Sequence, residues 1–195
     1  MPYDARAAVV AEDADRGRVE REQRARPGRP DHAAELVRDL EGGRVPALLG
    51  AGANGLYANE RVDDGQKHIA EQLFRATGLC TWIADEALMN TVTALSGSGP
   101  AYVFLLCEAM QAAAEKQGLP KETAQALAVQ TFVGAAKMLS ESGETPDVLR
   151  QRVTSPNGTT HAAVTVFEQG GLRLLVQTAL DAATERGKAL SKEND

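Results

Sequence analysis

The regular recurrence of apolar residues from Glu86 almost to the C-terminus restricts the possible folds of this chain more than any other feature. These side chains return every three or four positions, which places them on one face of a helix. Stop signals such as Gly118-Leu119-Pro120 separate one helical segment from the next. The sequence therefore predicts a mainly α protein. One helix begins at Glu86 and a second begins after a tight turn at 96–100. Four more are expected over 121–140, 147–152, 162–168 and 172–190.

The helix expected to follow this turn is apolar almost all the way round between Ala101 and Leu106. Such a helix belongs inside an assembly, because a lone chain would expose a large apolar patch. We therefore expect a homodimer or a higher homo-oligomer.

Residues 1–44 differ in composition from the rest of the chain. Every basic residue among them is arginine, Asp and Glu are interleaved with the arginines, and large apolar side chains are few. Such a stretch buries little surface, so we expect a poorly ordered arm without an assigned function. A nucleic-acid-binding arm is the alternative, but the interleaved acids cancel the positive field that it requires.

The segment 45–85 has the pattern of strand, helix and strand, like the end of an α/β sheet. Its glycine-rich stretch 50–55 matches GxGxxG, a pattern that marks a dinucleotide site only where a helix follows directly. Here 56–62 alternates like a strand instead, so we expect the glycines to form a flexible turn between extended segments. A helix is expected from Asp63 or Asp64 to Gly78, and a second strand over 79–83.

Charge and cysteine content exclude several classes of function. The chain of 195 residues carries a formal net charge of −6 and has no basic stripe, which argues against nucleic acid as a partner. Cys80 and Cys107 lack the spacing of metal ligands, so we expect two reduced, buried thiols. The sequence shows neither a signal peptide nor a membrane span. These features predict a cytoplasmic protein without a metal site.

A hydroxyl-rich stretch, Thr154-Ser155-Pro156-Asn157-Gly158-Thr159-Thr160, ends one helical pattern and opens another. The first amides of a helix lack internal partners and carry partial positive charge, which favours a carboxylate or a phosphate there. An ordinary capped helix is the other interpretation, since Ser and Thr are common N-caps.

A second polar stretch, 96–102, contains two serines, two glycines and a proline at the start of a helix. Its glycines allow another backbone, or a flat ligand ring, to approach closely. Ser98 lacks the GxSxG context of a hydrolase nucleophile.

Two segments closely resemble the signature stretches of pyrroline-5-carboxylate reductase, and their order and spacing fit that family. Shorter stretches at 45–48, 55–58 and 134–138 are similar too, so the resemblance runs from about Val45 to the C-terminus. The two segments are Ala94-Leu95-Ser96-Gly97-Ser98-Gly99-Pro100-Ala101-Tyr102 and Val153-Thr154-Ser155-Pro156-Asn157-Gly158-Thr159-Thr160.

The resemblance implies reduction of 1-pyrroline-5-carboxylate to L-proline with NADPH or NADH, on a Rossmann domain joined to an all-helical dimerisation domain. It implies that Ser155, Thr159 and Thr160 bind the substrate carboxylate, and that Thr160 lies near the ring nitrogen as a hydrogen-bond partner and possible proton donor, directly or through water. Ser96 and Ser98 are expected to line the pocket near the nicotinamide.

The resemblance also indicates what the chain lacks. Residues 1–44 resemble none of the Rossmann domain, and we find no cofactor-binding turn. We therefore expect 45–85 to be a remnant of that domain's sheet edge and 86–195 to be the helical dimerisation and substrate-binding domain. A truncated or rearranged gene is our hypothesis for this pattern. The alternative function is a catalytically incompetent helical oligomerisation module.

Overall fold

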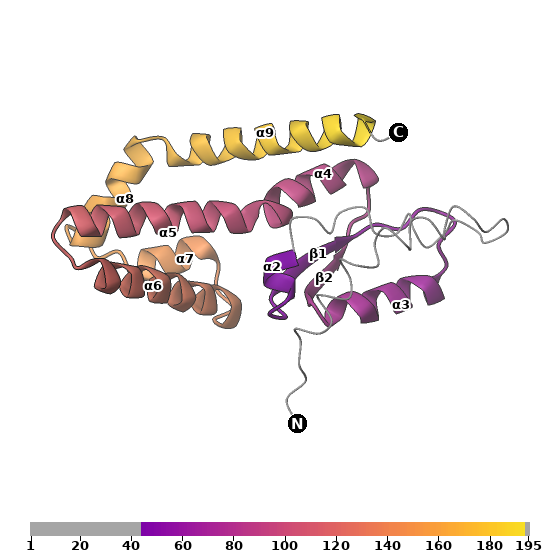
Figure 1. Ribbon diagram of the computed structural model, residues 1–195, viewed down its shortest axis with the longest axis horizontal. Helices are drawn as coiled ribbons and strands as arrows, with labels where there is room; N and C mark the ends of the chain where they lie inside the picture. Colours follow the sequence, from indigo (N-terminus) through magenta and orange to yellow (C-terminus); the bar gives the residue numbers. More distant parts are fainter. Residues whose placement is uncertain (1–43, 194–195) are drawn as a thin grey trace, which may run out of the picture. The chain divides into compact units, whose positions relative to one another are not determined.

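The computed structural model describes residues 44–193, so the expected poorly ordered arm lies almost wholly outside the described residues (Figure 1). The α/β part contains α2 (Arg44–Ala47), β1 (Gly52–Leu56), α3 (Asp64–Arg75) and β2 (Gly78–Trp82). The helical part follows as η1 (Glu86–Leu88), α4 (Met89–Val92), the π-helix η2 (Thr93–Gly97), α5 (Gly99–Lys116), α6 (Lys121–Glu141), α7 (Pro146–Arg152), α8 (Thr159–Gln169) and α9 (Leu172–Glu193). The expected fold class, mainly α with a small α/β unit in front, is confirmed.

From Gly52 on, the glycine-rich stretch lies in strand β1, so the flexible turn expected there is wrong except at Gly50, which does lie in a turn. β1 pairs in parallel with β2, in a register that sets Gly52 opposite Gly78. A Cβ atom on Gly78, whose φ is +145°, would lie 2.1 Å from the carbonyl oxygen of Gly52. Glycine is needed here because the two backbones approach each other so closely. The extended segments expected on either side are wrong too, since Pro46 lies in α2 and the strand ends at Leu56.

Helix α3 begins where the sequence predicts, because Asp63 caps it. The Asp63 carboxylate accepts a hydrogen bond from the amide of Gln66 at 2.8 Å, and the Gln66 side chain accepts one from the amide of Asp63 at 3.0 Å. This reciprocal pair is a capping box, which satisfies two of the amides that a helix start leaves unpaired.

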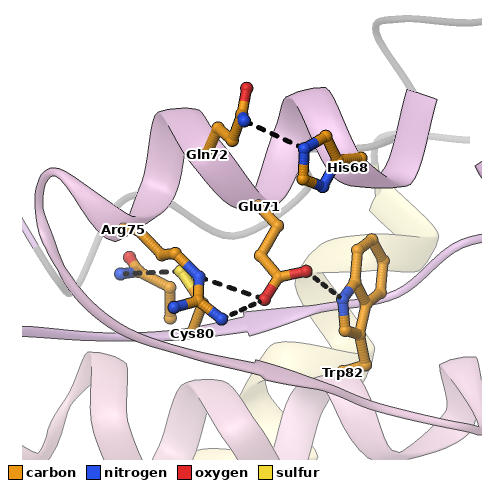
Figure 2. A network of polar contacts seen from close by, with 7 residues as sticks. His68, Glu71, Gln72, Arg75, Cys80 and Trp82 are labelled. Carbon is orange, nitrogen blue, oxygen red and sulfur yellow. Dashed lines mark hydrogen bonds and ion pairs between the residues drawn. The ribbon is translucent and has the colours of Figure 1, made fainter. Parts of the chain in front are cut away.

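Glu71 links α3 to strand β2 (Figure 2). One carboxylate oxygen accepts hydrogen bonds from Nε and Nη2 of Arg75, at 3.1 and 2.6 Å, and the other accepts from the indole of Trp82 at 3.4 Å. The Arg75 guanidinium, and next the Trp82 indole, hold the pKa of Glu71 below its ordinary value. The network therefore attaches α3 to the β2 end of the sheet.

Acidification is expected to weaken this attachment. Because the pKa of Glu71 is lowered by folding, its contribution is present above the unfolded-state pKa and is lost as the pH falls through the folded-state pKa. Below about pH 4.5, the ordinary glutamate value, the fluorescence of Trp82, the chain's only tryptophan, should shift in the wild type and shift less in Glu71→Gln. Glu60→Gln, at an exposed position, is the control. Equal acid responses of all three proteins would contradict this role.

The transition into α5 also differs from the expected tight turn at 96–100. The π-helix η2 continues from α4 to Gly97, and only a bend at Ser98 precedes α5. The amide of Ser98 donates to the carbonyl of Thr93 at 2.8 Å, which is the wider i to i+5 spacing of a π-turn. The hydroxyl of Tyr102, on α5, donates to the carbonyl of Ala94 at 3.1 Å and ties the two elements together.

The described part of a single chain contains very little core. Its buried apolar residues are Leu56, Ala70, Ala94, Ala124, Ala128 and Leu149. By contrast, Phe104 and Leu105 on α5 are 61% and 65% exposed, and Leu174 on α9 is 73% exposed. Long helices with apolar faces this exposed require a partner surface. None of the helices in 44–193 has the length and apolar content to cross a bilayer.

Candidate functional site

The hydroxyl-rich stretch forms the loop between α7 and the start of α8. The Thr154 hydroxyl donates to the carbonyl of Arg150 at 2.6 Å, which closes the end of α7. The amide of Gly158 donates to the carbonyl of Ser155 at 3.1 Å. Asn157 takes a left-handed φ of 62°, and a Cβ on Gly158 would lie 2.5 Å from the Ser155 hydroxyl oxygen. The loop is therefore a tight turn that fixes Ser155 beside Gly158.

Helix α8 begins at Thr159 without a side-chain cap. Its N-cap is Gly158, which has no side chain to bond the first amides, and no other side-chain cap is present. Ser155, Thr159 and Thr160 all lie exposed around this helix start. Open amides, the positive end of the helix dipole and three hydroxyls suit a carboxylate. The assignment of these residues to a substrate carboxylate stays a prediction.

Ser96 and Ser98 lie at the other signature, on η2 and the bend after it, and both are half-buried. The Ser96 hydroxyl donates to the carbonyl of Val92 at 2.9 Å, within the helix. A ligand would therefore meet the oxygen of Ser96 as an acceptor, unless this bond breaks. The pocket role of these two serines stays a prediction as well.

One chain does not bring the two signatures together. Helix α9 packs on α4 and η2, and one of these contacts is at Gly187, where an added Cβ would lie 2.7 Å from the side chain of Asn90. Helix α8 precedes the opposite end of α9, at Leu172. Fifteen helical residues separate Leu172 from Gly187, which is about 22 Å. Within one chain α8 packs on α9, whereas η2 packs on α4, α5 and α9, so we expect a single site that contains both Ser96 and Thr160 to need a second chain.

The described residues do not fit the pyrophosphate of a dinucleotide. The glycines of 50–55 lie before and within a strand, and no helix begins directly after them. The space beside them is occupied, because a Cβ on Gly55 would lie 2.6 Å from Val92 and one on Gly52 would lie 2.8 Å from the carbonyl of Thr77. The next helix start, α3, is closed by the Asp63 carboxylate, which repels an anion.

The sequence did not reveal an open hollow of about 480 Å³ that residues of α7, α8 and α9 line. Its apolar wall is rimmed by Arg150 and by an ion pair in which the Arg173 guanidinium bonds the Glu168 carboxylate at 2.7 and 2.8 Å. Arg173 holds the pKa of Glu168 below its ordinary value. Gly170 and Gly171 separate these partners in the sequence, so no helical spacing signals the pair. Val164, Phe167, Leu172 and Val176 form the apolar wall.

The two thiols are free, and they are half-buried rather than buried as expected. Burial raises the pKa of the Cys80 thiol, which the side-chain amide of Asn54 partly offsets. No cluster of three or more potential metal ligands occurs in the described part of the chain.

Comparisons with known proteins identify relatives of the helical part and of most of the chain. A family model described as pyrroline-5-carboxylate reductase dimerisation matches residues 86–190. The chain is 52% identical over 149 residues to the pyrroline-5-carboxylate reductase of Pseudomonas aeruginosa, covering 76% of this chain and 55% of that protein. It is 41% identical over 171 residues to the Synechocystis enzyme, covering 88% and 62%.

Solved structures of such enzymes share the fold. A pyrroline-5-carboxylate reductase from Coxiella burnetii superposes with a TM-score of 0.73 at 52% identity, covering 75% of this chain and 54% of that one. The Plasmodium falciparum enzyme, solved with NADP bound, gives a TM-score of 0.68 at 33% identity, with coverage of 74% and 59%. The chain thus spans little more than half the length of the relatives it matches.

Proposed function

Because the chain belongs to the pyrroline-5-carboxylate reductase family, we propose that it serves the reduction of 1-pyrroline-5-carboxylate to L-proline, as the part that dimerises and binds the substrate. This is an oxidoreductase step of proline biosynthesis. The observation that carries the proposal is the uncapped start of α8, where Ser155, Thr159 and Thr160 surround open amides. Cytoplasmic localisation belongs to the same proposal and is supported by the free thiols.

Each residue has a role that follows from the substrate, a cyclic imine with a carboxylate. Ser155, Thr159 and the first α8 amides bind the carboxylate, because hydroxyl and amide donors stabilise its charge in the positive end of the helix dipole. Thr160 bonds the ring nitrogen, directly or through a water, and is the candidate proton donor. Ser96 and Ser98 come from the second chain of a homodimer, because one chain keeps them apart from α8.

NADPH or NADH supplies the hydride when bound. Residues 44–193 offer no site for the pyrophosphate of that cofactor. The same observation favours a second candidate function, a catalytically incompetent oligomerisation module. The exposed apolar faces of α5 and α9 support association under both functions.

Binding of L-proline, which shares the carboxylate of the substrate, tests the proposed function. We expect the full chain to bind L-proline, and Thr160→Ala to weaken binding roughly tenfold, since a hydrogen bond to a charged or polar ligand atom contributes about 1.5 kcal/mol. Thr165→Ala is the matched control, because this hydroxyl, on the same helix, donates to the carbonyl of His161 at 2.8 Å. Titration calorimetry measures the affinities.

Two further measurements separate the two functions. Saturable NADPH binding and proline formation by the chain alone would show a complete reductase. L-Proline binding without NADPH binding is the result we expect, and it identifies a substrate-binding half. Absence of L-proline binding, or equal losses in Thr160→Ala and Thr165→Ala, would overturn the substrate site and leave the oligomerisation module.

A further inference from the structure

The π-turn of η2 diverts a backbone hydrogen bond within the first signature stretch. In an α-helix the amide of Ser98 would donate to the carbonyl of Ala94, four residues earlier. Here it donates to the carbonyl of Thr93 at 2.8 Å. The Ala94 carbonyl thereby loses its α-helical donor, and Ala94 is only 1% exposed, so solvent offers no ready replacement. A buried carbonyl that is left without a hydrogen bond lowers stability.

The hydroxyl of Tyr102 supplies the missing donor. It comes from the first turn of α5 and donates to the Ala94 carbonyl at 3.1 Å. A phenol carries a single proton, so this bond leaves none to donate to a ligand. Tyr102 therefore acts on the backbone of η2 rather than on a substrate.

The π-turn determines how the serines of the first signature are oriented relative to α5. Its bond encloses one residue more than a turn of α-helix, and each residue of an α-helix corresponds to about 100° of rotation. A return to the α-helical register would therefore rotate Ser96 relative to α5 by roughly this angle. The side chain of Ser98, the residue before α5, caps none of its amides. The direction in which both hydroxyls face thus depends on the turn.

We propose that Tyr102 is a positioning residue, whose hydroxyl holds the π-turn and with it the orientation of Ser96 and Ser98. This inference rests on the proposed function, in which both serines line the substrate pocket. Single π-turns within helices frequently occur at functional sites. Loss of the hydroxyl lowers the fraction of chains that present the two serines to a ligand, and apparent affinity falls with that fraction.

Nuclear magnetic resonance of the full 195-residue chain tests whether Tyr102 holds the turn. Tyr102→Phe removes only the hydroxyl, so the carbon-13 resonance of the Ala94 carbonyl should move upfield as its hydrogen bond is lost. The Ser98 amide should exchange with solvent roughly fivefold faster, the factor that corresponds to loss of one hydrogen bond. Tyr57→Phe, at a half-buried tyrosine outside η2 and α5, should change neither. Unchanged Ala94 and Ser98 signals in Tyr102→Phe would overturn the proposal.

A double-mutant cycle with L-proline as the ligand tests the link to the serines. We expect Tyr102→Phe to weaken L-proline binding roughly fivefold in the wild-type background. The loss should be less than about twofold when Ser96→Ala and Ser98→Ala are already present, because the changes then act on the same contact. Equal losses in both backgrounds would overturn the link. So would a change in helical circular dichroism or in solution mass, since the hydroxyl would then support the fold as a whole.

Failure of this inference and failure of the proposed function are distinguishable. If the wild-type chain binds no L-proline, the proposed function fails, while the Ala94 and Ser98 signals still report whether Tyr102 holds the turn. If L-proline binds and Tyr102→Phe binds it as tightly as the wild type, the proposed function stands and the positioning role is overturned.

Discussion

Replacing Gly78 with alanine is expected to separate β1 from β2 while the helices α5 to α9 keep their structure. The added Cβ would lie 2.1 Å from the carbonyl oxygen, 2.5 Å from the nitrogen and 2.7 Å from the carbonyl carbon of Gly52. These neighbours are backbone atoms that cannot rotate away. The φ of +145° is also strained for any residue with a Cβ. We expect a loss of at least about 3 kcal/mol in the stability of the α/β unit.

Trp82 fluorescence and far-ultraviolet circular dichroism together measure this effect. The tryptophan should become exposed in Gly78→Ala, while most of the helical signal remains. Gly143→Ala is the matched control, since its φ is +71° but a Cβ there meets no atom within 4 Å. It should cost only about 1 kcal/mol. Equal effects of the two substitutions would show that φ alone, and not the contact between the strands, sets the cost.

The same glycines show why the sequence predicted the helices and strand β2 well and strand β1 poorly. Helical periodicity is local, so the segments around Leu127 and Leu175 could be assigned from their neighbours. Gly52 and Gly78 are required because their two backbones meet, although they lie 26 positions apart in the sequence. No local pattern shows this contact. A glycine-rich stretch is by itself typical of a turn, and the strand becomes apparent only with its partner in place.

The candidate site was predictable in part for a similar reason. A helix start after the hydroxyl-rich stretch was predicted from the sequence, although α8 begins at Thr159 and not at Ala162. The π-turn of η2 could not be predicted from the sequence. Its hydrogen bonds span five residues where those of an α-helix span four, and this change leaves the pattern of apolar residues almost unchanged. Nor does sequence spacing reveal that Ser96 and Thr160 lie apart in one chain, since this separation results from the length of α9 and its contact with Asn90.

A charge in the middle of α5 is expected to abolish the proposed homodimer. Leu105 is 65% exposed in the single chain, with Phe104 and Leu106 beside it also exposed, and a helix apolar on nearly every side has no stable solvent-facing position. Burial of a leucine in an interface contributes about 2 kcal/mol, and a twofold interface buries it twice. Leu105→Glu removes both contributions and adds two buried charges. The dissociation constant of the dimer should therefore rise at least 1,000-fold.

Size-exclusion chromatography with light scattering distinguishes the two states, because each chain has a mass of 20.7 kDa. The wild type should elute as a dimer or larger, and Leu105→Glu as a monomer or as aggregated chain. Ile69→Glu, on α3 at 59% exposure, should keep the wild-type mass, since α3 lies outside the region 86–190 that matches the dimerisation family. A soluble wild-type monomer would contradict the assignment of α5 to an interface. It would also remove the second chain on which the joining of Ser96 and Thr160 into one site depends.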